Sequence, residues 1–241
     1  MKTERELLFK RINERFVRAF VTYRLLEDND NVLVGLSGGK DSLLLTELLA
    51  RRARIHHPTF RVEAVHVRME NISYETSTDY LHAFCNELGV RLHVITTRFE
   101  ASDTKPPCFL CSWHRRKQLF NLAQQLGCNK IALGHHRDDI IHTALMNLTF
   151  QGRFGTMPAL LRMRKMPLSI IRPLCLIDEA DIRHYAEMAG YRKLLKQCPY
   201  EHETNRTAIA RLYADMERMN PEARFSVWKA LEKEGKLVEE Y

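Results

Sequence analysis

The stretch Asn31-Val-Leu-Val-Gly-Leu-Ser-Gly-Gly-Lys-Asp-Ser-Leu-Leu-Leu45 decides the fold. Its first residues, 31–36, are typical of a short buried strand, and the leucines that follow have helical spacing. Between the two, Gly38 and Gly39 permit a sharp turn and a close approach of the backbone to a ligand. The free amides and the positive dipole end of the new helix favour an anion. The sequence therefore predicts a phosphate-binding turn between a strand and a helix.

The residues of this turn narrow the kind of phosphate site. Lys40 adds a mobile positive charge, and the flanking serines add hydroxyl donors. A Walker A loop needs glycine, four residues and then Gly-Lys-Ser/Thr, but Val34 and Asp41 occupy two of the required positions. No Gly-x-Gly-x-x-Gly occurs, which excludes the Rossmann fingerprint. The segment at residues 37–42 instead resembles the PP-loop of ATP pyrophosphatases, which cleave ATP between the α and β phosphates. The alternative is a plain Gly-Gly turn with a solvated lysine.

The composition limits the class of protein. The chain has 241 residues, 45% hydrophobic and 28% charged, which is ordinary for a globular protein with one full core. No apolar stretch is as long as a membrane span, and residues 1–6 are too polar for a signal peptide, so we expect a cytoplasmic protein without a membrane partner. A net charge of +7 favours a polyanionic partner. Six cysteines without a secretion signal favour metal binding or thiol chemistry over disulfides.

Strands and helices are predicted to alternate along the chain after an amphipathic N-terminal helix at residues 4–26. The expected strands are residues 31–36, 62–67, 90–96, 130–133 and 170–174. Beyond the helix that follows the phosphate-binding turn, the expected helices are 78–88, 112–126, 138–149, 178–189, 204–219 and 222–234. Asp178 is expected to cap the N-terminus of its helix, and Gly89, Gly127 and Gly190 are expected to end theirs. This pattern predicts an α/β fold with a doubly wound, mainly parallel five-stranded sheet covered by helices on both faces. We divide the chain into an N-terminal helix (1–26), a PP-loop domain (27–195) and a helical C-terminal extension (196–241).

The segment Gly134-His-His-Arg-Asp-Asp139 follows the fourth strand and is expected at the same sheet edge as the PP-loop, because parallel strands end at one edge. Asp138 and Asp139 should lie in the first turn of a helix, where they either form an ordinary cap, hold Mg²⁺ on phosphates or transfer a proton. Neighbouring helical residues diverge by about 100°, so only one of the two is expected to face the reaction centre. We also expect His66 and Gly134 to contact the nucleotide.

A cysteine pair, Cys108 and Cys111, forms the third constellation. Two cysteines at this spacing can bind one metal atom, and zinc, iron–sulfur and redox interpretations all remain open. Cys198, in an irregular segment, is the best candidate for a remote third ligand. A zinc site would recruit His114 or His202 as a fourth ligand. The other three cysteines lie in or beside apolar segments and are expected to pack in the core.

Taken together, these motifs resemble those of the tRNA 2-thiocytidine synthetase family. The resemblance runs over about residues 10–215 and rests on Ser37–Ser42, Cys108–Cys111 with Arg115 and Arg116, Gly134–Asp139, Ile171–Leu174 and Cys198. It implies the fold of the adenine nucleotide alpha hydrolases and the adenylation, with ATP and Mg²⁺, of the C2 oxygen of an anticodon-loop cytidine. It also implies a [4Fe–4S] cluster, bound by Cys108, Cys111 and Cys198, that supplies sulfur to displace AMP. The PP-loop residues Ser37, Gly38, Gly39, Lys40, Asp41 and Ser42 would bind ATP, with Lys40, Asp41, Asp138 and Asp139 in catalysis.

Two other functions fit parts of the pattern. A lysidine-synthetase-like enzyme would adenylate tRNA but use an amine nucleophile, and it would not need Cys108 or Cys198. A zinc-stabilised protein that binds tRNA or nucleotide would transfer no sulfur. The leading interpretation implies tRNA and a sulfide donor, such as a cysteine desulfurase system, as partners. The leucine-rich face of the N-terminal helix suits either packing on the sheet or a homodimer contact.

Overall fold

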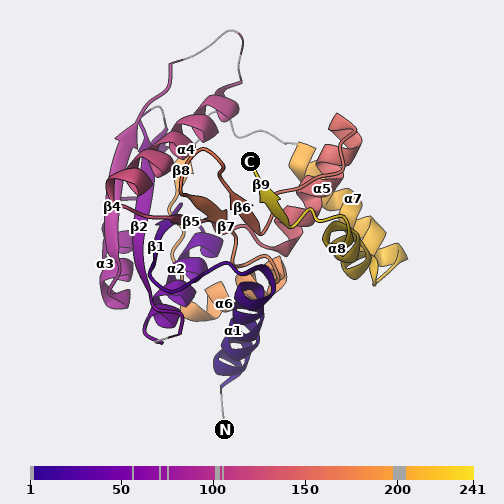
Figure 1. Cartoon of the computed structure of the whole chain (residues 1–241), viewed down its shortest axis with the longest axis horizontal. Coiled ribbons are helices and arrows are strands. Elements are labelled where there is room, and N and C mark those ends of the chain that lie inside the picture. The colour runs from indigo at the N-terminus through magenta and orange to yellow at the C-terminus, as the bar shows by residue number, and fades with distance from the viewer. Residues whose placement is uncertain are drawn as a thin grey trace.

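The computed structural model describes residues 3–55, 57–70, 72–74, 76–100, 104, 106–197 and 205–241. Its centre is a seven-stranded sheet in the order β4-β2-β1-β5-β7-β6-β9 (Figure 1). The bounds of the strands are β1 Asp30–Gly35, β2 Phe60–Met69, β4 Arg91–Thr97, β5 Lys130–Ala132, β6 Leu160–Arg162, β7 Ser169–Ile171 and β9 Val238–Glu240. A separate antiparallel pair joins β3 (Ser73–Tyr74) to β8 (Lys196–Gln197). The predicted α/β class is confirmed.

The five expected strands all form, and they pair in parallel as β4-β2-β1-β5-β7. The expected strand number was too low, because β6 and β9 extend one edge. β6 runs antiparallel to β7, and β9 pairs in parallel with β6. Each of these two strands has three residues, which is too short for a period-two pattern to stand out in the sequence.

The helices divide between the two faces of the sheet. Their bounds are α1 Glu4–Tyr23, α2 Lys40–Ala53, α3 Asp79–Leu88, α4 Pro107–Gln125, α5 Arg137–Gln151, α6 Glu179–Ala189, α7 Asn205–Met219 and α8 Ala223–Lys233. Strand β1 shows the division, because Val32 and Val34 join the larger core with residues of α1, α2, α3, α5 and α6, whereas Leu33 joins a smaller core under α4. Alternate residues of a strand point to opposite faces, so both faces of β1 are covered.

Several helix ends lie where the sequence places them. Gly89 and Gly190 are left-handed C-caps of α3 and α6, and Gly127 has a positive φ just after α4. Asp178 is the N-cap residue of α6, but its side chain makes no capping hydrogen bond there. It binds arginines instead, so the expected cap is only positional.

The C-terminal segment was expected to be helical, but it also contains a strand. Helices α7 and α8 lie beside α5 (Figure 1), but the chain then returns to the sheet as β9. The backbone of Leu160 donates a hydrogen bond to the carbonyl of Leu237, and Tyr241 donates to Arg162. The extension is therefore built into the α/β domain.

Asp178 ties the N-terminal, central and C-terminal parts of the chain together. Its carboxylate accepts hydrogen bonds from Arg15 of α1 at 2.8 Å, from the Nε of Arg137 of α5 at 2.8 Å and from Arg224 of α8 at 2.5 Å. Burial alone would raise the pKa of Asp178, but Arg137 and the other two arginines outweigh it and lower the pKa. Three elements distant in sequence thus depend on one partly buried carboxylate.

We predict that Asp178→Ala lowers the free energy of unfolding by about 2–4 kcal/mol, because it leaves three poorly solvated arginines without their shared partner. Since the pKa of Asp178 is lowered by folding, this stabilisation is present above about pH 4 and is lost as the pH falls through the folded-state pKa. Urea unfolding followed by circular dichroism at several pH values measures both effects. The control is Asp215→Ala, which breaks an exposed pair with Arg218 and should cost less than about 1 kcal/mol. Equal stability of the two variants would contradict the assignment.

Candidate functional site at the carboxyl edge of the sheet

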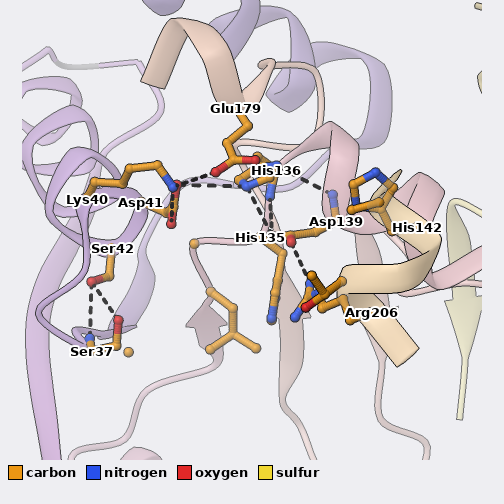
Figure 2. Close-up of a pocket in the computed structure, with 15 residues that line it drawn as sticks. Ser37, Lys40, Asp41, Ser42, His135, His136, Asp139, His142, Glu179 and Arg206 are labelled. Atoms are coloured by element: carbon orange, nitrogen blue, oxygen red, sulfur yellow. Dashed lines mark hydrogen bonds and ion pairs between the residues drawn. The ribbon is translucent and has the colours of Figure 1, made fainter. Parts of the chain in front are cut away.

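The sheet reverses its strand order between β1 and β5, and a cavity of about 560 Å³ opens at the carboxyl ends of these two strands (Figure 2). Ligands of open α/β sheets bind at this kind of switch point. The loop after β1 and the first turn of α2 form one wall, and the segment from Leu133 to Asp139 forms another. His142 of α5, Glu179 of α6 and residues 206, 207 and 210 of α7 complete the lining. The PP-loop at residues 37–42 and the motif at residues 134–139 therefore lie at one cavity, as expected.

Hydrogen bonds within residues 37–42 hold the turn open toward the cavity. The Ser42 hydroxyl donates to the carbonyl of Gly39 at 3.0 Å and accepts from the backbone N–H of Ser37 at 3.1 Å. Gly38 has a φ of +84°, and a Cβ there would come within 2.6 Å of the Cβ of Leu194. Only glycine fits this position, for conformational as well as steric reasons.

Gly134 lets the β5 loop touch the first turn of α2. A Cβ on Gly134 would lie 3.0 Å from the backbone N of Ser42 and 3.2 Å from the carbonyl oxygen of Asp41. These are backbone atoms of a helix start, so they cannot move aside independently. The absence of a side chain at Gly134 therefore sets the spacing between the two walls of the cavity.

Lys40 lies in a cluster of opposite charges. Its ammonium is 3.1 Å from a carboxylate oxygen of Asp41 and 3.0 Å from one of Glu179 (Figure 2). Burial would lower the pKa of Lys40, but the two carboxylates outweigh it and raise the pKa. Burial likewise would raise the pKa of Glu179, and its hydrogen bond with Lys40 lowers it. Lys40 stays cationic, and a bound anion would compete with these carboxylates for it.

Asp138 and Asp139 diverge as expected. Asp138 is 8% exposed and accepts a hydrogen bond from the backbone N–H of Glu179 at 2.8 Å. Asp138 itself is not among the residues that line the cavity. Although burial would raise the pKa of Asp138, His136, the Glu179 amide and Arg224 lower it far below its usual range. Asp139 lines the cavity and forms an ion pair with Arg206 at 2.5 Å (Figure 2). Asp138 thus braces α5 against α6, and Asp139 is the carboxylate available to a ligand.

The two histidines before α5 have opposite pKa shifts. Burial and the charge of Arg172, whose Nε donates to Nδ1 of His135, lower the pKa of His135 to about 4. Burial would also lower the pKa of His136, but Asp138, Asp139 and Asp41 raise it. At neutral pH His135 is an uncharged imidazole, whereas His136 retains its charge to a higher pH than an ordinary histidine.

A second cavity, of about 310 Å³, lies on the other side of the β1 loop. Gly35, Ser37 and Leu133 line both cavities. The remaining walls come from the end of β2, from Tyr74, from Arg115 and Leu119 of α4, and from Lys193 and Leu194. His66 is part of this lining, and the predicted nucleotide residues are therefore divided between two cavities that meet at one loop.

Cys108 and Cys111 lie in the first turns of α4, because this helix begins at Pro107 and not at residue 112 as expected. Residues three apart on a helix share a face, so the two thiols suit one metal group. Cys108 is exposed and Cys111 is partly buried, with Met69, Ile72 and Phe99 in the neighbouring apolar cluster. Cys198 lies outside the described residues. Within the described part of the chain, no group of three metal-binding side chains was found.

The remaining cysteines pack as expected. Cys85, Cys128 and Cys175 are buried, and burial raises the pKa of Cys85 and of Cys128 to about 11.

In the described residues, no helix combines the length and the apolar character that a bilayer span requires.

Five titratable lining residues were not among the sequence candidates: His135, His136, His142, Glu179 and Arg206. The sequence contains a signal for Glu179, because this residue begins the helix after the fifth parallel strand and therefore lies at the same sheet edge as the PP-loop. It contains none for Arg206, since the docking of α7 on α5 depends on tertiary packing. His135 and His136 belong to the motif at residues 134–139, and His142 lies one turn further along α5.

Comparisons with known proteins agree with this geometry. A family model described as the PP-loop domain matches residues 8–212. The tRNA-cytidine(32) 2-sulfurtransferase of Pseudomonas putida strain F1 is 32% identical over 232 residues, which cover 93% of this chain and 84% of that protein. The chain belongs to the PP-loop tRNA-cytidine(32) 2-sulfurtransferase family. Another member, from Bordetella avium strain 197N, is 34% identical over 93% of this chain and 73% of its own length.

A solved structure shares the fold of the present chain. It is the U34-tRNA thiolase NcsA from Methanococcus maripaludis with its [4Fe-4S] cluster, with a TM-score of 0.75 and 24% identity over 95% of this chain and 79% of that one. The family resemblance seen in the sequence is confirmed, as is the PP-loop fold.

We predict that Gly134→Ala weakens ATP binding by at least about tenfold, because the added Cβ pushes the β5 loop away from the first turn of α2. Isothermal titration calorimetry with ATP measures the effect. The control is Gly155→Ala, where the Cβ would meet only the flexible side chain of Arg153. Unchanged affinity in a folded Gly134→Ala protein would refute the role of this close approach.

Proposed function

We propose that the protein catalyses the ATP-dependent replacement of the C2 oxygen of cytidine 32 in tRNA by sulfur. One observation supports this most directly: the helix that bears the Cys108–Cys111 pair also borders the nucleotide site. Arg115, one helical turn after Cys111, lines the second cavity, as Ser37 does. The proposed sulfur-binding and adenylating sites would therefore share one sheet edge.

The two cavities suit the two parts of ATP. The larger one offers the PP-loop amides, Lys40 and the start of α2 to the phosphates. The smaller one has more apolar walls, including Val65, Val67 and Leu133, and suits the adenosine. Asp139 would hold Mg²⁺ on the phosphates, since carboxylate oxygens suit this ion. ATP and Mg²⁺ would then displace part of the ion pairing that Lys40 and Asp139 make in this structure.

Adenylation makes the carbonyl oxygen of the base a leaving group. The C2 oxygen attacks the α-phosphorus, the bond to the β-phosphate oxygen breaks, and pyrophosphate departs with the negative charge. The amides of the PP-loop and Lys40 stabilise the charge that develops on the phosphates. The guanidinium of Arg206 and the imidazole of His136, whose pKa is raised by the neighbouring carboxylates, lie at the cavity wall and add to this stabilisation.

Sulfur then replaces the activated oxygen. The exposed and partly buried thiols of Cys108 and Cys111, beside Arg115 and Arg116 and at a helix start, fit thiolate ligands of a cluster, with Cys198 as the proposed third ligand. A [4Fe–4S] cluster held by three cysteines would leave one iron free to bind the sulfide used in the reaction. Sulfide adds to C2, AMP leaves with the former carbonyl oxygen, and no electron donor is required.

A cluster needs a supply of sulfide, and a cysteine desulfurase system in the cytoplasm is the proposed source. The lysidine-synthetase-like alternative uses the same adenylating site but has no use for a cysteine pair beside it. The zinc-stabilised alternative would leave the PP-loop without a reaction. Anaerobic purification followed by metal analysis and a visible spectrum distinguishes iron–sulfur from zinc.

We predict that Asp139→Asn lowers tRNA-dependent release of pyrophosphate at least about 100-fold, because the cavity loses its metal-binding carboxylate. Asp138→Asn is the matched variant, and it should lower the unfolding midpoint while the rate per folded molecule changes less. A pyrophosphate release assay together with thermal unfolding separates the two effects. A near-normal rate for Asp139→Asn, at limiting Mg²⁺, would assign the role to another residue.

We predict that Cys108→Ala abolishes formation of 2-thiocytidine but leaves ATP binding within about twofold of the wild-type value. Nucleoside analysis of tRNA by liquid chromatography and mass spectrometry, with calorimetry for ATP, provides the two measurements. Cys85→Ala, at a buried cysteine of the core, is the control and should retain thiolation. Continued thiolation by Cys108→Ala would favour an enzyme without a cysteine-bound cluster.

A further inference from the structure

The second cavity contains a buried polar atom whose hydrogen-bonding capacity is unused within the described residues. His66 is 2% exposed and lines this cavity near the end of β2. Its Nε2 is buried and has no hydrogen-bond partner in the described part of the chain. A buried polar atom without a partner is costly, so a histidine retained here points to a ligand that supplies the missing hydrogen bond.

The tautomer of His66 follows from its other ring nitrogen. Nδ1 lies 2.7 Å from the carbonyl oxygen of Leu36, and a carbonyl can only accept. Nδ1 must therefore carry the proton and donate it. In a neutral imidazole with Nδ1 protonated, Nε2 has a lone pair and acts only as an acceptor.

The surroundings keep this imidazole neutral. Burial lowers the pKa of His66, and the nearby guanidinium groups of Arg115 and Arg68 lower it further, against the opposing hydrogen bond to Leu36. Tyr74 packs edge-on to the ring, with centroids 6.4 Å apart, and restricts its orientation. His66, a residue of the cavity lining, thus has one unpartnered acceptor atom in a fixed orientation.

We propose that Nε2 of His66 accepts a hydrogen bond from the 6-amino group of adenine and so selects 6-aminopurine nucleotides. This inference rests on the proposed function, which places a purine nucleoside triphosphate with its phosphates on the PP-loop. Ser37 lines both cavities, so a base in the smaller one is continuous with phosphates in the larger one. Of the groups on a purine ring edge, the 6-amino group is the donor that distinguishes adenine from 6-oxopurines.

The same arrangement disfavours guanine and hypoxanthine. Their 6-oxo oxygen is an acceptor and would face the lone pair of Nε2, which leaves two desolvated acceptors opposed. His66 cannot relieve this by changing tautomer, because Nδ1 would then lose its hydrogen bond to Leu36. Selection thus comes from repulsion of the wrong base as well as from attraction of the right one.

The test compares ATP with two triphosphates that differ at position 6, binding to the full-length wild-type protein. Inosine triphosphate carries a 6-oxo group, and purine riboside triphosphate carries hydrogen at position 6. We expect affinity to fall about tenfold for purine riboside triphosphate and about 100-fold for inosine triphosphate, measured by calorimetry. His66→Ala should bind ATP and purine riboside triphosphate within about twofold of each other, whereas His82→Ala, at an exposed histidine, should discriminate as the wild type does.

The outcomes separate this inference from the function on which it rests. Equal binding of ATP and purine riboside triphosphate by the wild-type protein would overturn the inference about His66 but not the proposed function. This outcome does not depend on whether His66→Ala folds. Retained discrimination in a folded His66→Ala protein would do the same. Wild-type protein that binds no nucleotide would overturn both the proposed function and this inference.

Discussion

The close approach of Gly134 to the first turn of α2 is the constraint on which the rest of the site depends. A side chain there would meet backbone atoms of Asp41 and Ser42, so the spacing between the loops after β1 and β5 is fixed by the backbone itself. This spacing brings His136 within 3.9 Å of Asp41 and lets Glu179 reach Lys40. Because the contact joins two parallel strands at the switch point, it turns a topological property of the sheet into a cavity of defined width.

The charges around this cavity are organised in pairs that a ligand would have to rearrange. Lys40 is held by two carboxylates and Asp139 by Arg206, so the groups suited to phosphate and to a metal ion neutralise each other. Arg206 comes from α7, beyond the segment that contains Cys198. The C-terminal extension thus contributes to the phosphate cavity as well as to the sheet edge, and Asp178 fixes it to α1 and α5. A nucleotide bound in the proposed position would therefore be linked to the placement of the C-terminal helices through neighbouring ion pairs.

The sequence predicted the parts of the fold that local chemistry determines. The glycines after α3, α4 and α6 end their helices as predicted, since a left-handed residue at a helix end is a local requirement. The divergence of Asp138 and Asp139 also followed from helix geometry, although which of them lines the cavity depended on Glu179. By contrast, β6 and β9 are short edge strands defined by pairing partners far away in the chain. Arg206 and the His66 tautomer depend on such distant contacts as well, so a single sequence contains no signal for them.

Two cavities that meet at one loop impose an order on the chemistry. A nucleotide with its base near His66 must pass its phosphates over Ser37, which places the α-phosphate near the junction and the β- and γ-phosphates toward Lys40 and Asp139. The α-phosphate is then the phosphate nearest to α4, whose Arg115 borders the base cavity and whose first turns bear Cys108 and Cys111. In this proposed arrangement, an acceptor base that approaches from the side of α4 would reach the α-phosphorus next to the cysteine pair. Adenylation of that base and its attack by sulfur would occur on the same side of the PP-loop, so the activated intermediate need not leave the site between the two steps.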